Sequence, residues 1–304
     1  MSNLTLTVLA AGVGARFGSR IKQLEPLGPA GELLIDYSVH DALSVGFDRV
    51  VFIIREDIEE LFKNTIGSRI EKLVKTEYVF QRPDRLPCRA GDFRTRQKPW
   101  GTAQAVYCCS DLIDGSFAVI NSDDFYSIDA FRKLAGFLNG FTADACSVDF
   151  LLKNTLSEYG EVNRGICRTD SAGLLTSVEE TRQIIRGSDG VIRGRYNGCE
   201  KLLDENSVTS MSMWGFRADF TEVLERRLAD FLNNLQPDEL KSELAISDVV
   251  GQEIVSRGYK VRDIPTDGKW FGLTYEKDVE KARKTLAEYI DQGVYKSPLM
   301  SVDS

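Results

Sequence analysis

The sequence predicts an α/β protein: a three-layer sandwich in which helices cover both faces of a mainly parallel sheet. Short apolar runs rich in Val, Ile and Phe alternate with longer amphipathic segments, which is typical of βαβ units. The composition, 42% hydrophobic and 28% charged over 304 residues, is that of a globular chain with a sizeable core. We expect a single domain over residues 1–304, made of two halves, 1–150 and 151–304.

The first half has the clearest alternation. Each expected strand is rich in β-branched and apolar residues, and each expected helix repeats apolar residues every three or four positions. The first helix is expected to end near Gly46, because glycine is favoured just after a helix. The expected strands are 4–11, 49–55, 76–81, 116–124 and 145–152, and the expected helices are 31–47, 56–67, 101–113 and 127–140.

After about residue 155 the alternation loosens. Residues 158–181 and 211–220 have the pattern of hairpins and strands suited to form the wall of a pocket. Residues 219–258 are expected to be helical, 259–266 to form a strand, and 275–292 to form a closing helix.

The formal net charge of −8 disfavours broad nucleic-acid binding, which normally uses a basic face. The six cysteines include no CxxC pair, so reduced thiols in the cytoplasm are the simplest interpretation. No secretory pattern is visible at the N-terminus, and no apolar run reaches the roughly 18–20 residues of a membrane helix. We therefore expect a cytoplasmic protein without a membrane contact.

His40 is the only histidine, and it lies in a segment expected to be an amphipathic helix. A packing or surface position is the favoured interpretation for it. Ser-His-Asp and Cys-His catalysis are excluded unless His40 itself takes part, and multi-His metal sites are excluded altogether. A metal would have oxygen ligands, which favours magnesium over zinc.

A glycine loop with Gly12, Gly14 and Gly18 follows the first expected strand. Amides of such a loop can face an anion beyond the carboxyl end of a strand. Two common phosphate motifs fail on spacing here. The dinucleotide pattern GxGxxG would place its third glycine at Phe17, and a P-loop needs a lysine directly after Gly18.

The string "LAAGVGARFGSRIK" resembles the signature of sugar nucleotidyltransferases, which join a nucleoside triphosphate to a sugar phosphate. The resemblance implies a Rossmann-like, GT-A-type fold in which the loop wraps the triphosphate. It also implies that Arg16 stabilises charge on the phosphates, and that Lys22 touches the α-phosphate or the incoming phosphate. The implied nucleotide-binding residues of the loop are Ala10, Ala11, Gly12 and Gly14.

A second segment, "KPWGTAQAV", resembles the family's GTAxA or GLAQA segment, which grips the nucleobase. Gly101, Thr102 and Gln104 match it. The expected helix start at Gly101 also offers unpaired amides. A plain helix start with small residues is the alternative interpretation.

A third segment, "VINSDDFY", ends a strand in two acids. By resemblance Asp123 is the magnesium ligand of the family, with Asp124 directly after it. One or two carboxylates plus phosphate oxygens are the usual ligands of Mg2+ in nucleotide enzymes. The alternative is a helix N-cap, since a helix is expected to follow.

Further on, "EYGEVNRG" and "SVEET" resemble the acceptor-binding part of the family, with Tyr159, Gly160 and Glu179 as the matching residues. Two positions depart from the family pattern. Glu180 stands where a lysine often binds the sugar phosphate, and Gly272 stands where a second acidic metal ligand is usual. These departures indicate a divergent branch, with Asp124 or Asp267 available as a replacement acid.

Residues 82–98 hold five arginines and one lysine against two aspartates. We interpret this segment as a flap that attracts anionic substrate, with a solvated surface loop as the alternative.

The sequence therefore predicts a Mg2+-dependent nucleotidyltransferase that joins an NTP to a sugar phosphate, giving an NDP-sugar and pyrophosphate. Residues 1–150 would bind the NTP and residues 151–304 the acceptor. Cytidylyl transfer to a non-sugar phosphate such as phosphocholine or a polyol phosphate is the neighbouring alternative. A non-catalytic module that binds nucleotide sugars is a second alternative, and a glycosyltransferase is a third. The partners would be an NTP and a phosphorylated sugar or alcohol, without nucleic acid, and a homo-oligomer stays open.

Overall fold

Four parallel strands form the centre of the sheet, with β1 in the middle. The computed structural model describes residues 3–12, 25–88, 96, 98–158, 160–236, 239, 241–273 and 277–299. In it, β1 pairs in parallel with β2 and β4, and β2 pairs in parallel with β3. Nearly every residue of β1 and β2 is buried, as expected where both faces of a parallel sheet are covered. These strands are β1 (Leu4–Leu9), β2 (Arg49–Ile54), β3 (Lys75–Phe80) and β4 (Ser116–Asn121).

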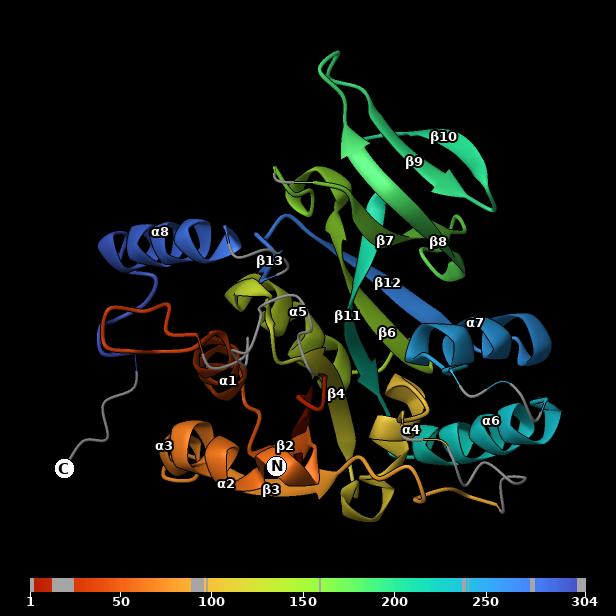
Figure 1. Cartoon of the computed structure of the whole chain (residues 1–304), viewed down its shortest axis with the longest axis horizontal. Helices are drawn as coiled ribbons and strands as arrows, with labels where there is room; N and C mark the ends of the chain where they lie inside the picture. The colour runs from red at the N-terminus through yellow and green to blue at the C-terminus, as the bar shows by residue number, and fades with distance from the viewer. Residues whose placement is uncertain are drawn as a thin grey trace.

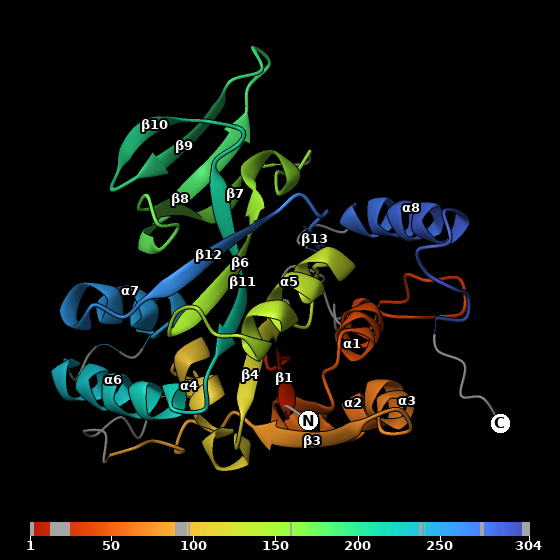
Figure 2. The same ribbon diagram turned by 180° about the vertical axis from the view of Figure 1, so that it is seen from behind.

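Alternate residues of these strands point into two separate hydrophobic cores. In β2, Val50 and Phe52 belong to one core, whereas Val51 and Ile53 belong to the other; successive side chains of a strand point to opposite faces. The first core packs against α1 and α5, and the second against α4, α6 and α7. The predicted three-layer sandwich is therefore confirmed (Figure 2). The helices are α1 (Leu34–Ser44), α4 (Thr102–Tyr107), α5 (Ser127–Asn139), α6 (Phe220–Asn234) and α7 (Ile246–Arg257).

Beyond β4 the sheet continues as an antiparallel extension. β11 (Val208–Phe216) pairs antiparallel with β4, β6 and β7. The pairing register of β11 shifts between Ser210 and Trp214, at a bulge in which Ser212 has φ +61°. This shift allows β11 to pair with the parallel part of the sheet and with the antiparallel extension. Figure 1 shows β8, β9 and β10 projecting from the top of the molecule. The other strands are β6 (Ala145–Leu151), β7 (Val162–Thr169), β8 (Leu175–Arg186), β9 (Ile192–Tyr196), β10 (Cys199–Leu203) and β12 (Val261–Thr266).

One expected helix, over residues 56–67, is a composite run. It consists of η2 (Glu56–Ile58), α2 (Glu59–Phe62), the π-turn η3 (Lys63–Gly67) and α3 (Ser68–Ile70). Phe62, Ile66 and Ile70, spaced by four, are all buried in the first core. A spacing of four lies between the 3.6 residues of an α-turn and the wider π-turn, so the mixture keeps the three side chains on one face.

Two short strands connect the first half of the chain to its last helix. β5 (Asp124–Phe125) pairs antiparallel with β13 (Phe271–Gly272), and α8 (Asp278–Asp291) follows. The remaining short helices are η4 (Ser110–Leu112) and η5 (Leu152–Asn154). None of the helices in the described part of the chain has the length and apolar character needed to cross a membrane.

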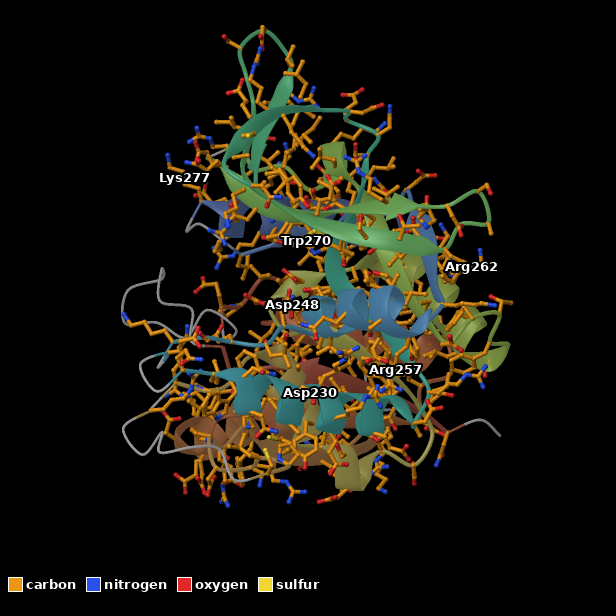
Figure 3. The ribbon with its side chains drawn as sticks, turned by 90° about the vertical axis from the view of Figure 1, so that its right-hand side faces the viewer. Asp230, Asp248, Arg257, Arg262, Trp270 and Lys277 are labelled. Atoms are coloured by element: carbon orange, nitrogen blue, oxygen red, sulfur yellow. The ribbon has the colours of Figure 1, made fainter. Side chains whose placement is uncertain are left out.

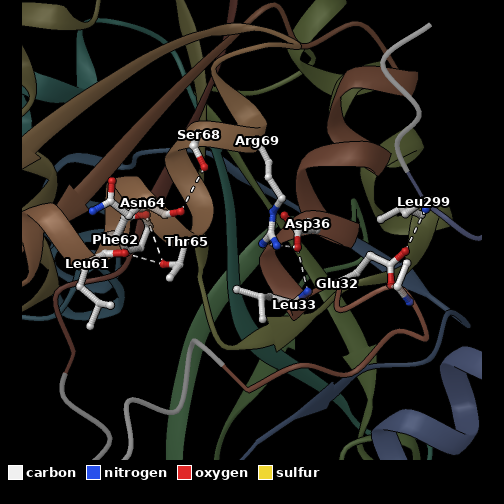
Figure 4. A network of polar contacts seen from close by, with 11 residues as sticks. Glu32, Leu33, Asp36, Leu61, Phe62, Asn64, Thr65, Ser68, Arg69 and Leu299 are labelled. Atoms are coloured by element: carbon white, nitrogen blue, oxygen red, sulfur yellow. Dashed lines mark hydrogen bonds and ion pairs between the residues drawn. The ribbon is translucent and has the colours of Figure 1, made fainter. Parts of the chain in front are cut away.

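The C-terminal part returns to the segment that precedes α1. The Leu299 amide donates to Oε1 of Glu32 at 3.0 Å, in the network drawn in Figure 4. Arg283 of α8 donates to the Pro26 carbonyl at 2.9 Å and to Glu25 at 2.8 Å. Residues 25–32, which come directly after the glycine-loop region, are thus held by the end of the chain.

Candidate active site

A cavity of about 740 Å³ opens at the carboxyl ends of the four parallel strands. Its size falls in the usual range for small-molecule sites. The residue just after each strand, or near its end, lines it: Gly12 for β1, Arg55 for β2, Gln81 for β3 and Asp123 for β4. This is the place where open α/β sheets bind ligands. We call it the strand-end cavity.

The strand-end cavity gathers residues from all three nucleotide segments of the sequence. Ala11, Gly12, Gly101, Thr102 and Asp123 all line it. Ala10 lies buried just behind, where its amide donates to the Ile53 carbonyl at 2.8 Å. Gly14, Arg16 and Lys22 lie outside the described residues.

The backbone conformation and the close packing at position 101 require a glycine. Its φ is +101°, and an added Cβ would lie 2.4 Å from the Leu244 carbonyl oxygen, so a side chain is excluded. Thr102 next to it lines the cavity, and its hydroxyl accepts the Ile246 amide at 3.0 Å at the start of α7. The segment is therefore fixed against α7 while it borders the cavity.

Gln104 has a different place from the one expected. It is fully buried and does not line the cavity. Its amide Nε2 donates to the Arg82 carbonyl at 2.7 Å, and its Oε1 accepts from Nε2 of Gln81 at 3.0 Å. Gln81 also donates to the Gly101 carbonyl at 3.0 Å. Gln81 is thus the glutamine that faces the ligand space, and Gln104 orients it.

Arg82, Pro83 and Lys98 of the basic segment 82–98 line the strand-end cavity. Arg82 pairs with Glu56 at 2.6 Å, and Lys98 pairs with Glu243 at 2.7 Å. Arg96 is buried, stacks 3.8 Å from the Trp100 ring centre and donates to several backbone carbonyls. The described part of this segment is thus fastened to its neighbours, and its role in substrate attraction stays a prediction.

Two carboxylates stand at the end of β4. Asp123 faces the strand-end cavity. Asp124 is buried. Its Oδ2 accepts a hydrogen bond from Nδ2 of the Asn121 side chain at 2.8 Å and lies 3.2 Å from the Tyr126 hydroxyl. Gly272 of β13 is directly opposite, and an added Cβ there would lie 2.5 Å from Oδ1 of Asp124. The space above Gly272 is therefore filled by Asp124.

A second cavity of about 620 Å³, which we call the β7–α8 cavity, lies on the other side of this acidic end. Gly272 and Trp270 line it, together with Arg164 of β7, Asp278 of α8 and the predicted acceptor residue Gly160. In the view of Figure 3, Trp270 lies below the strands of the antiparallel extension and above the helices α6 and α7. The two cavities therefore flank Asp123 and Asp124.

The other predicted acceptor residues are not gathered in this cavity. Glu179 lines neither cavity; it pairs with Arg168 at 3.1 Å and with Lys201 at 3.3 Å. Tyr159 lies outside the described residues. Lys201 is thus paired with a carboxylate.

Few side chains in the described part of the chain are available to bind a magnesium ion. Among the described residues no group of three or more His, Cys, Asp or Glu side chains could hold a metal. Asp123 offers a carboxylate at the cavity wall, and Asp124 is the next acid. This donor set suits Mg2+ held by one or two carboxylates with phosphate and water completing its shell.

Comparison with known proteins agrees with this geometry. Residues 7–196, more than half of the chain, match the family "Nucleotidyl transferase". The chain belongs to this family. As a nucleotidyltransferase it transfers a phosphorus-containing group. No curated protein matches the sequence of this nucleotidyltransferase.

Solved structures share its fold. A protein assigned as a glucose-1-phosphate thymidylyltransferase from Bacillus anthracis, in complex with sucrose, is 17% identical with a TM-score of 0.62. The match covers 93% of this chain and 94% of that one. The inositol-1-phosphate CTP transferase from T. maritima is 13% identical, also with a TM-score of 0.62, and the match covers 96% and 98%.

Sequence reasoning missed three residues that line the cavities: Arg55, Gln81 and Arg164. Arg55 and Gln81 are the last residues of two expected strands, so their position at a ligand-binding edge was a usable signal. Arg164 had no such signal, because its placement depends on how the antiparallel extension meets α8.

Proposed function

We propose that this nucleotidyltransferase joins an NTP to a phosphorylated acceptor and releases pyrophosphate, with a sugar phosphate as the acceptor. One observation carries the proposal: two cavities, one at the strand ends and one between β7 and α8, flank a pair of carboxylates. The strand-end cavity would hold the NTP, and the β7–α8 cavity would hold the acceptor.

The reaction needs no covalent enzyme intermediate. An oxygen of the acceptor phosphate attacks the α-phosphorus in line, a new P–O bond forms, and the bond to pyrophosphate breaks. The acceptor phosphate is already ionised, so no general base is required. Catalysis then consists of positioning and charge neutralisation. Arg16 and Lys22 are the proposed phosphate cations, with Tyr159, Gly160 and Glu179 as the proposed acceptor contacts.

Asp123 would hold a Mg2+ ion, with Asp124 as the second acid. When bound, the ion would neutralise charge on the phosphates. Asn121 and Tyr126 orient Asp124 through its Oδ2, and no side chain at position 272 competes for the same space. In this proposal the junction of β4 and β5 supplies both carboxylates.

A polyol phosphate is the second candidate acceptor, with CTP as donor. The observation that favours it is the acceptor side, where position 180 is a glutamate and Glu179 is already paired with Arg168 and Lys201. The fold likeness to an inositol-1-phosphate CTP transferase is consistent with it. An acceptor panel measured with each NTP, with products weighed by mass spectrometry, separates the two candidates.

Asp123→Asn tests the proposal. Pyrophosphate release with the best substrate pair should fall by about 10²-fold or more, because one charge contact in the transition state contributes about 3 kcal/mol. Lys22→Ala should have a similar effect. Asp230→Asn, on the distant helix α6 (Figure 3), is the matched control and should leave turnover unchanged. Near-wild-type turnover of both Asp123→Asn and Lys22→Ala would refute the mechanism.

A further inference from the structure

The β7–α8 cavity is rich in cations, although the whole chain carries a net charge of −8. Five basic side chains line it against two acids. The basic residues are Lys153, Arg164, Arg186, Lys269 and Lys281, and the acids are Glu158 and Asp278. A cavity lined this way attracts an anion.

Four of these cations already have partners. Lys281 pairs with Glu158 at 2.8 Å, and Arg186 pairs with Glu205 at 3.1 Å. The remaining two are Lys153, which donates to Asn206 at 2.8 Å, and Lys269, which lies 5.6 Å from the Tyr289 ring centre. Arg164 differs from these four, because its hydrogen bonds go to backbone carbonyls.

Arg164 is held by its backbone neighbours rather than by an acid. Its Nη2 donates to the Thr155 carbonyl at 2.6 Å and its Nη1 to the Asn163 carbonyl at 2.8 Å. The guanidinium lies 4.8 Å from the ring centre of Trp270, a cation–π contact. Arginine has five N–H donors in a rigid fork, so these two bonds leave several donors for a ligand.

Two donors on the wall of the β7–α8 cavity lack an acceptor. Nε of Arg164 and Nε1 of Trp270 are both buried and have no hydrogen-bond partner in the described part of the chain. A buried donor left unpaired costs about 1–3 kcal/mol. Both groups are donors only, so a bound oxyanion would supply what this wall is missing. Both side chains line the β7–α8 cavity.

The surroundings also place Arg164 at the reacting end of the cavity. Burial lowers its pKa to about 10, opposed by attraction to Asp124, Glu180 and Asp278. The guanidinium therefore stays charged at neutral pH. Trp270, whose ring centre is 4.8 Å from the guanidinium, lies beside Gly272, and the Cβ position of Gly272 is 2.5 Å from Oδ1 of Asp124. Arg164 is therefore near the carboxylate pair.

We propose that Arg164, with the indole N–H of Trp270, binds the phosphate group of the acceptor in the β7–α8 cavity. This inference rests on the proposed function and names the cation that position 180 does not supply. The ligand class is a phosphate monoester, because a planar guanidinium offers paired donors that match phosphate oxygens. Arg164 is thus a residue that selects the acceptor and does not contact the NTP.

Steady-state kinetics with separate variation of the two substrates test this assignment. Arg164→Gln should raise the KM for the acceptor at least tenfold and change the KM for the NTP by less than twofold. Arg164→Lys keeps the charge but loses the fork, so its acceptor KM should be intermediate. Arg193→Gln, an exposed arginine of β9 paired with Asp189, is the control and should match wild type. An unchanged acceptor KM in Arg164→Gln would overturn the inference.

A binding measurement separates this inference from the proposed function. Inorganic phosphate should raise the melting temperature of the wild-type protein more than that of Arg164→Gln, with Arg193→Gln responding like wild type. If the wild type transfers no nucleotide to any acceptor, the proposed function fails, whereas the phosphate response still tests Arg164. Equal phosphate responses would refute the anion site. If Arg164→Gln does not fold, the same two comparisons with Arg164→Lys decide.

Discussion

Gly272 leaves room for a carboxylate that comes from another strand. An added Cβ would lie 2.5 Å from Oδ1 of Asp124 and 3.0 Å from the ring of Trp270. Asp124 cannot move away easily, since Asn121 and Tyr126 hold its other oxygen. The glycine at 272 and the aspartate at 124 are therefore a matched pair.

Gly272→Ala should destabilise the protein by about 1–3 kcal/mol, the usual cost of forcing extra volume into a packed place. Gly136→Ala is the control. Gly136 lies in α5, and nothing is within 4 Å of its Cβ position, so alanine there should stabilise by about 0.5–1 kcal/mol. Urea unfolding of both variants measures the difference. Equal stability of the two variants would contradict the close contact.

The positions of single residues could be predicted where a residue type or a strand pattern in the sequence reflects a constraint on the backbone. Gly101 combines a positive φ with close packing, and Asp123 ends a clear strand. The interpretation of Gln104 as a base contact could not be checked from spacing, because only the fold reveals that Gln81 lies between it and the cavity. Gly14, Arg16 and Lys22 stay predictions.

At the scale of elements, the joint between β6 and β12 contains a buried acid pair. Asp149 of β6 is fully buried, and it accepts from the Ser147 hydroxyl at 2.6 Å and from the Cys167 thiol at 3.3 Å. Asp263 of β12 interacts with it. Burial and the negative charge of Asp149 raise the pKa of Asp263 to about 8. The pair therefore retains one proton at neutral pH.

This pair makes the stability pH-dependent. The folded protein holds the proton up to about pH 8, whereas an unfolded aspartic acid loses it near pH 4. Folding therefore binds protons in that window, and the free energy of unfolding should fall as pH rises from about 4 to about 8. The slope is at most about 1.4 kcal/mol per pH unit.

Asp263→Asn should flatten this slope, because its amide donates to Asp149 without a titrating proton. The variant should gain stability relative to wild type at pH 8 and above. Chemical denaturation at pH 6 and pH 8.5 measures both effects. A wild-type slope retained in the variant would contradict the shared proton.

Helices and strands could be predicted from the sequence where their own residues, and not tertiary contacts, determine the local structure. β1 and β2 are apolar runs. The segments predicted as strands after residue 155 overlap β7, β8 and β11, whereas β9 and β10 were not predicted. The composite run from Glu56 to Ile70 was predicted as one helix over 56–67, because a π-turn depends on the surface beneath it. The bulge in β11 depends likewise on three partner strands.

At the scale of the whole molecule, a third core joins α8 and the segment after it to α1 and β5. α8, Tyr295 and Leu299 pack with Tyr37 of α1 and Phe125 of β5. Tyr295 also donates to Asp41 of α1 at 2.8 Å. This core is separate from the two that cover the sheet. It packs around Phe125, the residue directly after Asp124 in β5.

Leu299→Ala tests how far the end of the chain contributes. Leu299 is buried, so its truncation should cost about 2–4 kcal/mol. Leu61→Ala is the matched control, since Leu61 is 44% exposed and should cost less than about 0.5 kcal/mol. Thermal unfolding of the two variants compares them. Similar melting temperatures would mean that the third core adds little.

The bonds from Arg283 and Leu299 to residues 25–32 also bear on the order in which the protein is made. The parallel strands and the glycine-loop region are translated before the residues that hold residues 25–32 in place. A nascent chain can therefore build most of its central sheet during synthesis. It can complete the support next to the glycine-loop region only once Leu299 has been translated, so full stability of residues 25–32 should appear after translation of α8 and the segment around Leu299.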